Sequence, residues 1–173
     1  MNAPTQEIGD ADAFIAGYRA TLPGVFAYLL RATGGDRAVA EDLASETFFA
    51  ALTSWRTGNA DAISPAWLTG VARHKLIDRL RRNEREERKL ALVAASDNDG
   101  VDEELPTVDR LVLRGAIRKL PPLQRAVLAL RYVDDLSIID IANDLDRSVS
   151  AVDSLLRRAR RQLRELLLEG DLS

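Results

Sequence analysis

Arginines are concentrated on one face of a predicted helix near the C-terminus, where they are suited to contact nucleic acid. Apolar residues recur at helical spacing between positions 149 and 163: Val149, Val152, Leu156, Ala159 and Leu163. The opposite face displays Ser150, Ser154, Arg157, Arg158 and Arg161. Because a guanidinium is a planar fork of donors, it can bind phosphates and base edges. The alternative interpretation is a solvated arginine face on a helical hairpin.

A shorter predicted helix precedes this segment, and the two have the pattern of a helix-turn-helix. Its inward residues are predicted to be Ile138, Ile141, Ala142 and Leu145. Asp146 occupies the turn, where a residue must tolerate the left-handed conformation. Ser137 and Ser148 are the predicted N-caps of the two helices. In such a motif the N-terminal part of the second helix enters the DNA major groove.

Two other charged faces lie in the first half of the chain. Asp42, Glu46 and Phe49 are one turn apart on a predicted helix over 37–55, for which Asp36 is the predicted N-cap. They lie away from the apolar stripe of this helix, which consists of Val39, Leu43, Thr47, Phe48, Ala51, Leu52 and Trp55. Basic residues concentrate in 73–89, on a helix that Ser64 and a following proline are predicted to start. Both charged faces are also compatible with simple solvation, so the pattern alone leaves protein or DNA contact open.

Composition excludes several classes of site. The chain has no cysteine and one histidine, His74, so disulfides, thiolate metal sites and multi-histidine metal sites are excluded. It also lacks clustered carboxylates at metal spacing, a nucleophile with a base, and a glycine-rich phosphate loop. We therefore expect no metal, no cofactor and no catalysis. No apolar run approaches the ~20 residues of a membrane span, which predicts a cytoplasmic protein without membrane insertion.

The overall charge is unusual for a DNA-binding protein. The net charge is −3 at pH 7 and the pI is about 5.3, whereas neutralising phosphates requires basic surface. Since the basic residues are clustered, the chain is predicted to touch DNA locally but to bind duplex DNA weakly when alone.

The predicted fold is all-α, with two small helical domains joined by a flexible acidic linker. The expected order is a flexible tail (1–12), a first domain (13–92), the linker (93–107), a second domain (108–168) and a short tail (169–173). The linker assignment rests on a stretch rich in Ser, Asp, Asn, Gly and Glu. The second domain is predicted to be a four-helix domain that contains the helix-turn-helix.

Three stretches in this order resemble sigma factors of the extracytoplasmic-function group of the bacterial RNA polymerase sigma factor superfamily. AEDLASETFFAAL (40–52) is similar to the family's polymerase-binding helix. WLTGVARHKLIDRLRR (67–82) is similar to the helix that opens and reads the minus-ten element. LPPLQRAVLALRY (120–132), with the helix-turn-helix, is similar to the domain that reads the minus-thirty-five element. The resemblance covers roughly residues 13–168.

The resemblance implies a role for each charged face. The polymerase clamp helices of the largest subunit would bind Glu41, Asp42, Glu46 and Phe49. The minus-ten element would be held by Arg73, His74, Lys75, Arg79, Arg81 and Arg82, with a base pocket in the loop 56–63. The minus-thirty-five element would be contacted by Arg147, Ser148, Ser150, Asp153, Ser154, Arg157, Arg158 and Arg161. It also implies contact of the second domain with the polymerase flap, and control by an anti-sigma factor.

The sequence departs from the family pattern at a few positions. Asp153 and Leu155 stand where the family usually has Lys and Arg, and Ser45 and His74 stand where it often has Gln and Asn. Asp153 either accepts a hydrogen bond from cytosine N4 or weakens binding to the upstream element. Leu155 is expected to be exposed and to form an apolar patch for a protein partner. The alternative function is a stand-alone helix-turn-helix regulator that binds a duplex operator.

Overall fold

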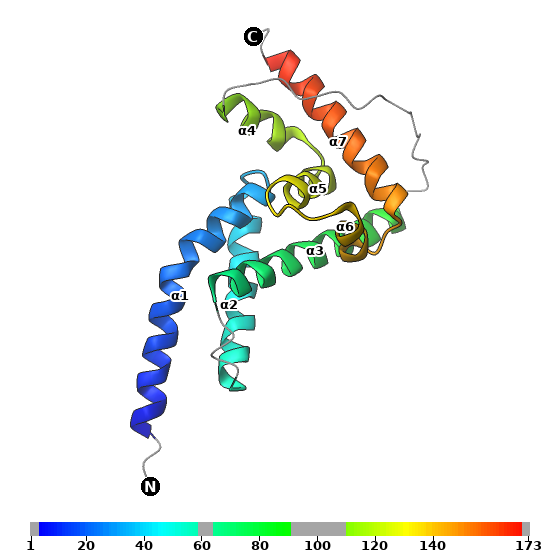
Figure 1. Cartoon of the computed structure of the whole chain (residues 1–173). Helices are drawn as coiled ribbons and strands as arrows, with labels where there is room; N and C mark the ends of the chain where they lie inside the picture. The colour runs from blue at the N-terminus through cyan, green and yellow to red at the C-terminus, as the bar shows by residue number, and fades with distance from the viewer. Residues whose placement is uncertain (1–3, 59–63, 91–109, 171–173) are drawn as a thin grey trace. The chain divides into compact units, whose positions relative to one another are not determined.

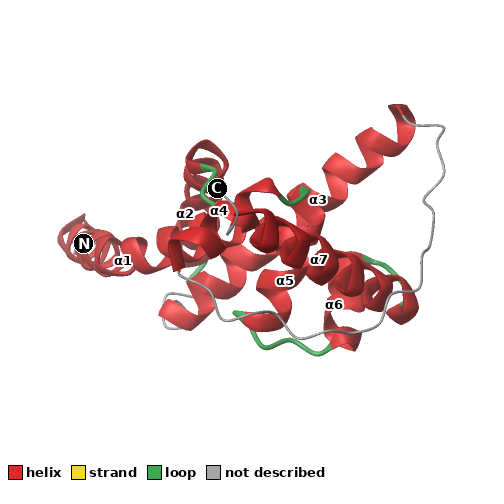
Figure 2. Ribbon diagram, turned by 90° about the horizontal axis from the view of Figure 1, so that it is seen from above, coloured by secondary structure: helices red, strands yellow, loops and turns green. Residues whose placement is uncertain are grey.

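The fold is all-α, as the sequence predicts: the residues that the structure describes form helices joined by turns, with no strand among them. The computed structural model describes the backbone of residues 4–58, 64–90 and 110–170, and side chains within 11–58, 64–86 and 110–169. The helices are α1 (Pro4–Ala32), α2 (Arg37–Arg56), α3 (Pro65–Leu90), α4 (Arg110–Lys119), α5 (Pro122–Tyr132), α6 (Ile138–Leu145) and α7 (Val149–Gly170) (Figure 1). Short turns connect α5, α6 and α7 (Figure 2).

The chain divides into two compact units. The first unit combines residues 1–30 with 36–76, and the second combines 31–35 with 77–173. The division falls inside α3. The expected linker at 93–107 lies outside the described residues.

Two side-chain caps start helices of the first unit where the sequence predicts them. The amide of Val39 donates to Asp36 Oδ1 at 3.1 Å, which satisfies one of the unpaired donors at the start of α2. The amide of Trp67 donates to Ser64 Oγ at 3.1 Å, with Pro65 as the first residue of α3. These caps set where the charged faces of α2 and α3 begin.

The core of the first unit comes from the apolar faces of its helices. Leu29, Leu43 and Ala51 are fully buried. Thr47 is also fully buried, and its hydroxyl donates to the carbonyl of Leu43 at 2.7 Å, so its polar atom is satisfied. Burial raises the pKa of the Tyr18 phenol above its ordinary value, and this hydroxyl donates to the carbonyl of Ala44 at 3.3 Å. The predicted apolar stripe of α2 is thus confirmed at its central positions.

Helix α1 is longer than the sequence suggested. It begins at Pro4, where a flexible tail over 1–12 was expected, and it continues through Pro23. Its stretch Ala11–Ala32 is long and apolar enough to cross a membrane by length and composition, although the expectation was that no segment would be. Core helices of soluble proteins pass the same test. In α1 the buried side chains of Val25 and Leu29 belong to the core of the first unit.

In the second unit, α7 packs against α4, α5 and α6, and its apolar face forms the centre of the core. Its buried residues are Val152, Leu155, Leu156, Ala159, Leu163 and Leu167. The expected exposure of Leu155 is therefore wrong, because this side chain is only 6% exposed. It lies three residues after Val152 and four before Ala159, on the face that three helices cover. The expected burial of Val149 is also wrong, since it is 49% exposed at the helix start.

The turn of the helix-turn-helix is fixed by local hydrogen bonds and one left-handed residue. Ser137 Oγ accepts from the amide of Asp140, and Ser148 Oγ accepts from the amide of Ala151, at 3.1 and 3.2 Å. Asp146 ends α6 with φ 53° and ψ 49°. This confirms both predicted N-caps and the predicted left-handed turn, and the turn sets the angle at which α7 leaves α6.

We expect Asp146→Ala to lower the free energy of unfolding by about 1 kcal/mol, because alanine has no local hydrogen bonds to offset the left-handed backbone. Asp146→Gly is the matched control and should change stability little, since glycine adopts this conformation without steric cost. Urea unfolding followed by circular dichroism measures both variants. Equal losses of stability would contradict a conformational role for this turn.

Candidate nucleic-acid and protein interfaces

The outer face of α7 displays the polar residues that the sequence placed there. Ser150 and Arg161 are exposed, and Ser154, Arg157 and Arg158 are partly exposed. Because their spacing follows the helical repeat opposite the buried stripe, packing of the apolar side turns this face outward. At the start of the helix the hydroxyls of Ser148 and Ser150 lie 3.2 Å apart. Guanidinium and hydroxyl donors along one face are suited to phosphates and base edges.

Two of these arginines are held by groups one turn earlier on the same helix. Arg157 Nη2 lies 3.1 Å from Asp153 Oδ2, and both side chains are a little over one-third exposed. Arg158 Nε donates to the carbonyl of Ser154 at 3.4 Å. Asp153 is thus brought together with a predicted DNA-binding arginine.

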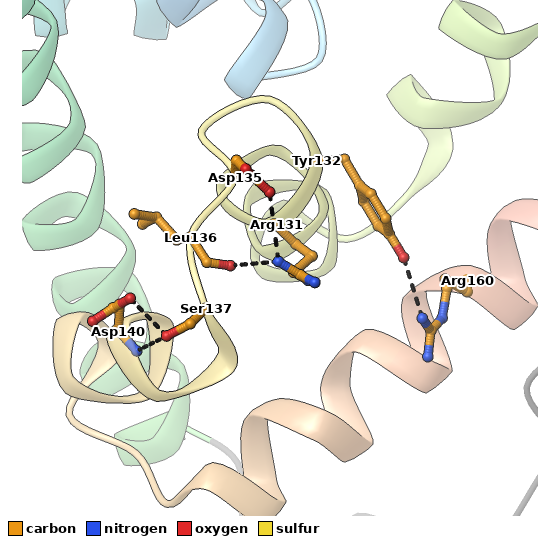
Figure 3. Close-up of polar contacts among 7 residues, drawn as sticks. All are labelled: Arg131, Tyr132, Asp135, Leu136, Ser137, Asp140 and Arg160. Atoms are coloured by element: carbon orange, nitrogen blue, oxygen red, sulfur yellow. Dashed lines mark hydrogen bonds and ion pairs between the residues drawn. The ribbon is translucent and has the colours of Figure 1, made fainter.

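Polar contacts join neighbouring elements of the second unit through three residues that the sequence analysis did not single out: Arg131, Tyr132 and Arg160 (Figure 3). Arg131 Nη1 donates to the carbonyl of Leu136 at 2.9 Å and lies 3.8 Å from Asp135 Oδ1. Arg160 Nη1 donates to the hydroxyl of Tyr132 at 3.1 Å, which joins α7 to the end of α5. Arg160 lies in the arginine-rich stretch, but Tyr132 is 28 residues away, so no local spacing predicts this bond.

The acidic face of α2 is accessible, as its predicted role in protein binding requires. Glu41 and Asp42 are exposed, and Phe49 is 64% exposed. Glu41 Oε1 accepts from Arg37 Nε at 2.7 Å. The exposed ring of Phe49 offers apolar contact area, and aromatic residues are enriched at protein interfaces. The carboxylates on the same helix can add charge complementarity to a basic partner.

The predicted minus-ten residues differ in their surroundings. His74 and Arg82 are exposed, whereas Arg73 and Arg79 are partly buried. Within the first unit, Lys75 Nζ lies 3.8 Å from Glu46 Oε2. Lys75, an expected DNA contact, is therefore beside Glu46, an expected polymerase contact. Of the loop 56–63, residues 59–63 lie outside the described residues.

Two predicted DNA contacts in the second unit have polar partners. Arg81 Nη2 donates to the carbonyl of Asn143 at 3.3 Å. The guanidinium of Arg147 forms an ion pair with Glu84, and both side chains are 19% exposed. Neither partner was among the site residues inferred from the sequence, because these pairs join positions more than sixty residues apart.

Two family profiles match the parts of the chain that carry these faces. The profile of sigma-70 region 2 matches residues 18–86, which include the charged faces of α2 and α3. The profile of sigma-70, region 4, matches residues 105–163, which include the helix-turn-helix.

Two curated relatives are similar in sequence to most of this chain. The ECF RNA polymerase sigma factor SigL of Mycobacterium tuberculosis is 35% identical over 152 residues, which are 82% of this chain and 81% of SigL. The ECF RNA polymerase sigma factor BldN of Streptomyces coelicolor is 31% identical over 93% of this chain, but the chain spans only 62% of BldN.

The fold resembles that of the sigma factor RpoE, solved in complex with the anti-sigma factor NepR from Bartonella quintana. The TM-score is 0.52 at 22% identity, over 90% of this chain and 97% of that one. The family profiles and the identity to SigL carry the assignment, and the structural likeness supports the fold. The chain therefore belongs to the extracytoplasmic-function (ECF) group of RNA polymerase sigma factors.

Proposed function

We propose that this chain binds core RNA polymerase in the cytoplasm and directs promoter-specific initiation of transcription, without catalytic activity of its own. The observation that carries the proposal is the separation of opposite charges onto different helices. Exposed carboxylates and Phe49 lie on α2, and an arginine face lies on α7. Neither face has the arrangement of an active site, and each is suited to a binding partner of opposite charge.

The acidic face of α2 is proposed to dock on the clamp helices of the largest polymerase subunit. The family resemblance implies that these helices present basic residues, to which Asp42 and Glu46 are complementary. Phe49 adds an apolar contact, and an exposed ring of this size is an effective anchor once water is excluded. The ion pair of Glu46 with Lys75 is partly exposed and weak, so a basic partner can replace it at little cost.

Promoter DNA is proposed to be contacted by α3 and α7. The basic residues of α3 would follow the backbone of the separated nontemplate strand, and α7 would enter the major groove of the upstream element. With a net charge of −3 the chain is a poor DNA ligand by itself. Attachment to polymerase raises the effective concentration of promoter DNA, so that weak contacts add.

An anti-sigma factor is the proposed regulator. RpoE, whose fold is similar, was solved in a complex with the anti-sigma factor NepR. A protein that covered the acidic face of α2 or the arginine face of α7 would block polymerase or promoter binding. We also propose that the helix-turn-helix domain contacts the polymerase flap, as the family resemblance implies.

The proposed function is tested by adding the purified chain to core RNA polymerase with genomic promoter fragments. Promoter-specific transcripts that core polymerase alone does not produce are the expected result. Tight binding to a duplex operator without polymerase, together with no stimulated initiation, would instead support a stand-alone regulator.

We expect the double charge reversal Asp42→Lys with Glu46→Lys to weaken core-polymerase binding by about a hundredfold or more, because cations would then face cations. Both positions are on the surface, so the helical circular dichroism signal should be retained. Biolayer interferometry with immobilised core enzyme measures the affinity.

The matched control is Glu165→Lys with Glu169→Lys, which changes the net charge equally on exposed positions of α7. Its affinity for core polymerase should stay within about threefold of the native value, since neither glutamate belongs to the acidic face of α2 and exposed charges are screened by salt. Equal weakening by the two double variants would show that net charge, and not the face of α2, governs docking.

We expect Arg158→Ala with Arg161→Ala to lower upstream-element binding by the holoenzyme and to flatten its salt dependence. Each lost phosphate contact should reduce the slope of log affinity against log salt by about 1. Electrophoretic mobility shifts at several salt concentrations measure the slope. Arg110→Ala with Arg114→Ala, two exposed arginines of α4, is the control, and a similar loss there would argue against specific use of α7.

A further inference from the structure

Asp153 and Arg157 form an ion pair on α7, the second helix of the helix-turn-helix. Arg157 Nη2 lies 3.1 Å from Asp153 Oδ2, with 38% of the arginine side chain and 42% of the aspartate side chain exposed. Their spacing of four residues places them one turn apart on the same side of α7. Arg157 is thereby directed toward the N-terminal end of the helix, which is the end that a helix-turn-helix inserts in the major groove.

The pair limits the rotamers of Arg157. An isolated arginine side chain has many rotamers, and part of this side-chain entropy is lost when the arginine binds a base. A carboxylate that already holds the guanidinium removes part of that freedom before DNA arrives. Because a guanidinium has five donors in a fixed fork, an interaction with Asp153 is compatible with a bidentate contact to guanine O6 and N7.

This geometry favours a base contact by Arg157 over a direct base contact by Asp153. Its Oδ2 already faces a cation, and moving it to cytosine N4 would break the ion pair and bring an anion closer to the phosphates. The stem of Arg157 is longer than that of Asp153, so the guanidinium is the group of this pair that reaches farther from the helix axis. In this pair, Arg157 is therefore the group that can reach a base, and the carboxylate of Asp153 orients its guanidinium.

We propose that Asp153 is a positioning residue that orients Arg157 to read a guanine in the upstream promoter element. This inference rests on the proposed function, because it assumes that α7 enters the major groove of promoter DNA. This role would explain how Asp153 can contribute to base selection, although its negative charge opposes binding to the DNA phosphates.

The test compares base preferences of complete holoenzymes on a promoter library whose upstream element is randomised, using sequencing of the transcripts. The variants are Asp153→Asn, Arg157→Lys, their combination, and Glu165→Gln as a control that removes one negative charge elsewhere on α7. In the native holoenzyme one position should prefer guanine by about tenfold, as a bidentate arginine contact gives. Both Arg157→Lys and Asp153→Asn should reduce that preference by about threefold or more.

Two further readouts separate positioning from a general effect. Asp153→Asn removes an anion, so its total affinity for DNA should be unchanged or higher even though the guanine preference falls. The double variant should lose no more preference than Arg157→Lys alone, because both substitutions disable the same contact. Asp153→Glu keeps the carboxylate and should retain more of the preference than Asp153→Asn, and Glu165→Gln should retain all of it.

The opposing results are distinct. An unchanged guanine preference in Asp153→Asn, with a loss in Arg157→Lys, would overturn the positioning role and leave the proposed function intact. Loss of a cytosine preference in Asp153→Asn, with no change in Arg157→Lys, would show direct reading by Asp153. A native holoenzyme that initiates at promoters with no preference in the upstream element would overturn both this inference and the proposed use of α7.

Discussion

Burial of one side of α7 against α4, α5 and α6 is the constraint on which the position of the arginine face depends. Leu155, Leu156 and Leu163 are held in this core, and the helical repeat then leaves the arginines on the opposite side. Each buried leucine contributes roughly 1.5–3 kcal/mol, whereas an exposed ion pair contributes less than about 1 kcal/mol. The apolar face therefore fixes the rotation of the helix, and the polar contacts adjust individual side chains.

The acidity of the chain is compatible with promoter binding once the charges are considered face by face. The carboxylates of α2 are suited to a basic protein partner, and the arginines of α7 are suited to DNA. A strongly basic sigma factor would be held on nonspecific DNA, since phosphate binding is independent of sequence. A net charge of −3 opposes such nonspecific binding, which fits the proposal that promoter contacts are strengthened by attachment to polymerase.

Small polar contacts refine what the core sets. The left-handed Asp146 and the serine N-caps fix the turn, while Arg131 and the bond between Tyr132 and Arg160 join neighbouring elements (Figure 3). On α7 itself, the pair of Asp153 and Arg157 couples an anion to a cation that is suited to bases. This pairing gives the carboxylate of Asp153 a cationic partner on the same helix.

Apart from the start of α1 at Pro4, the sequence by itself determined the helices, their caps at Asp36, Ser64, Ser137 and Ser148, and the left-handed turn, because these depend on neighbours within a few residues. It also identified the charged faces and the family, and the spacing of Asp153 and Arg157 already allowed their pairing. Tertiary structure decided the burial of Leu155 and the exposure of Val149, because the width of an apolar face depends on how many helices cover it. It also decided the bond from Arg160 to Tyr132 and the pairing of Lys75 with Glu46, which join residues distant in sequence, where no local periodicity applies.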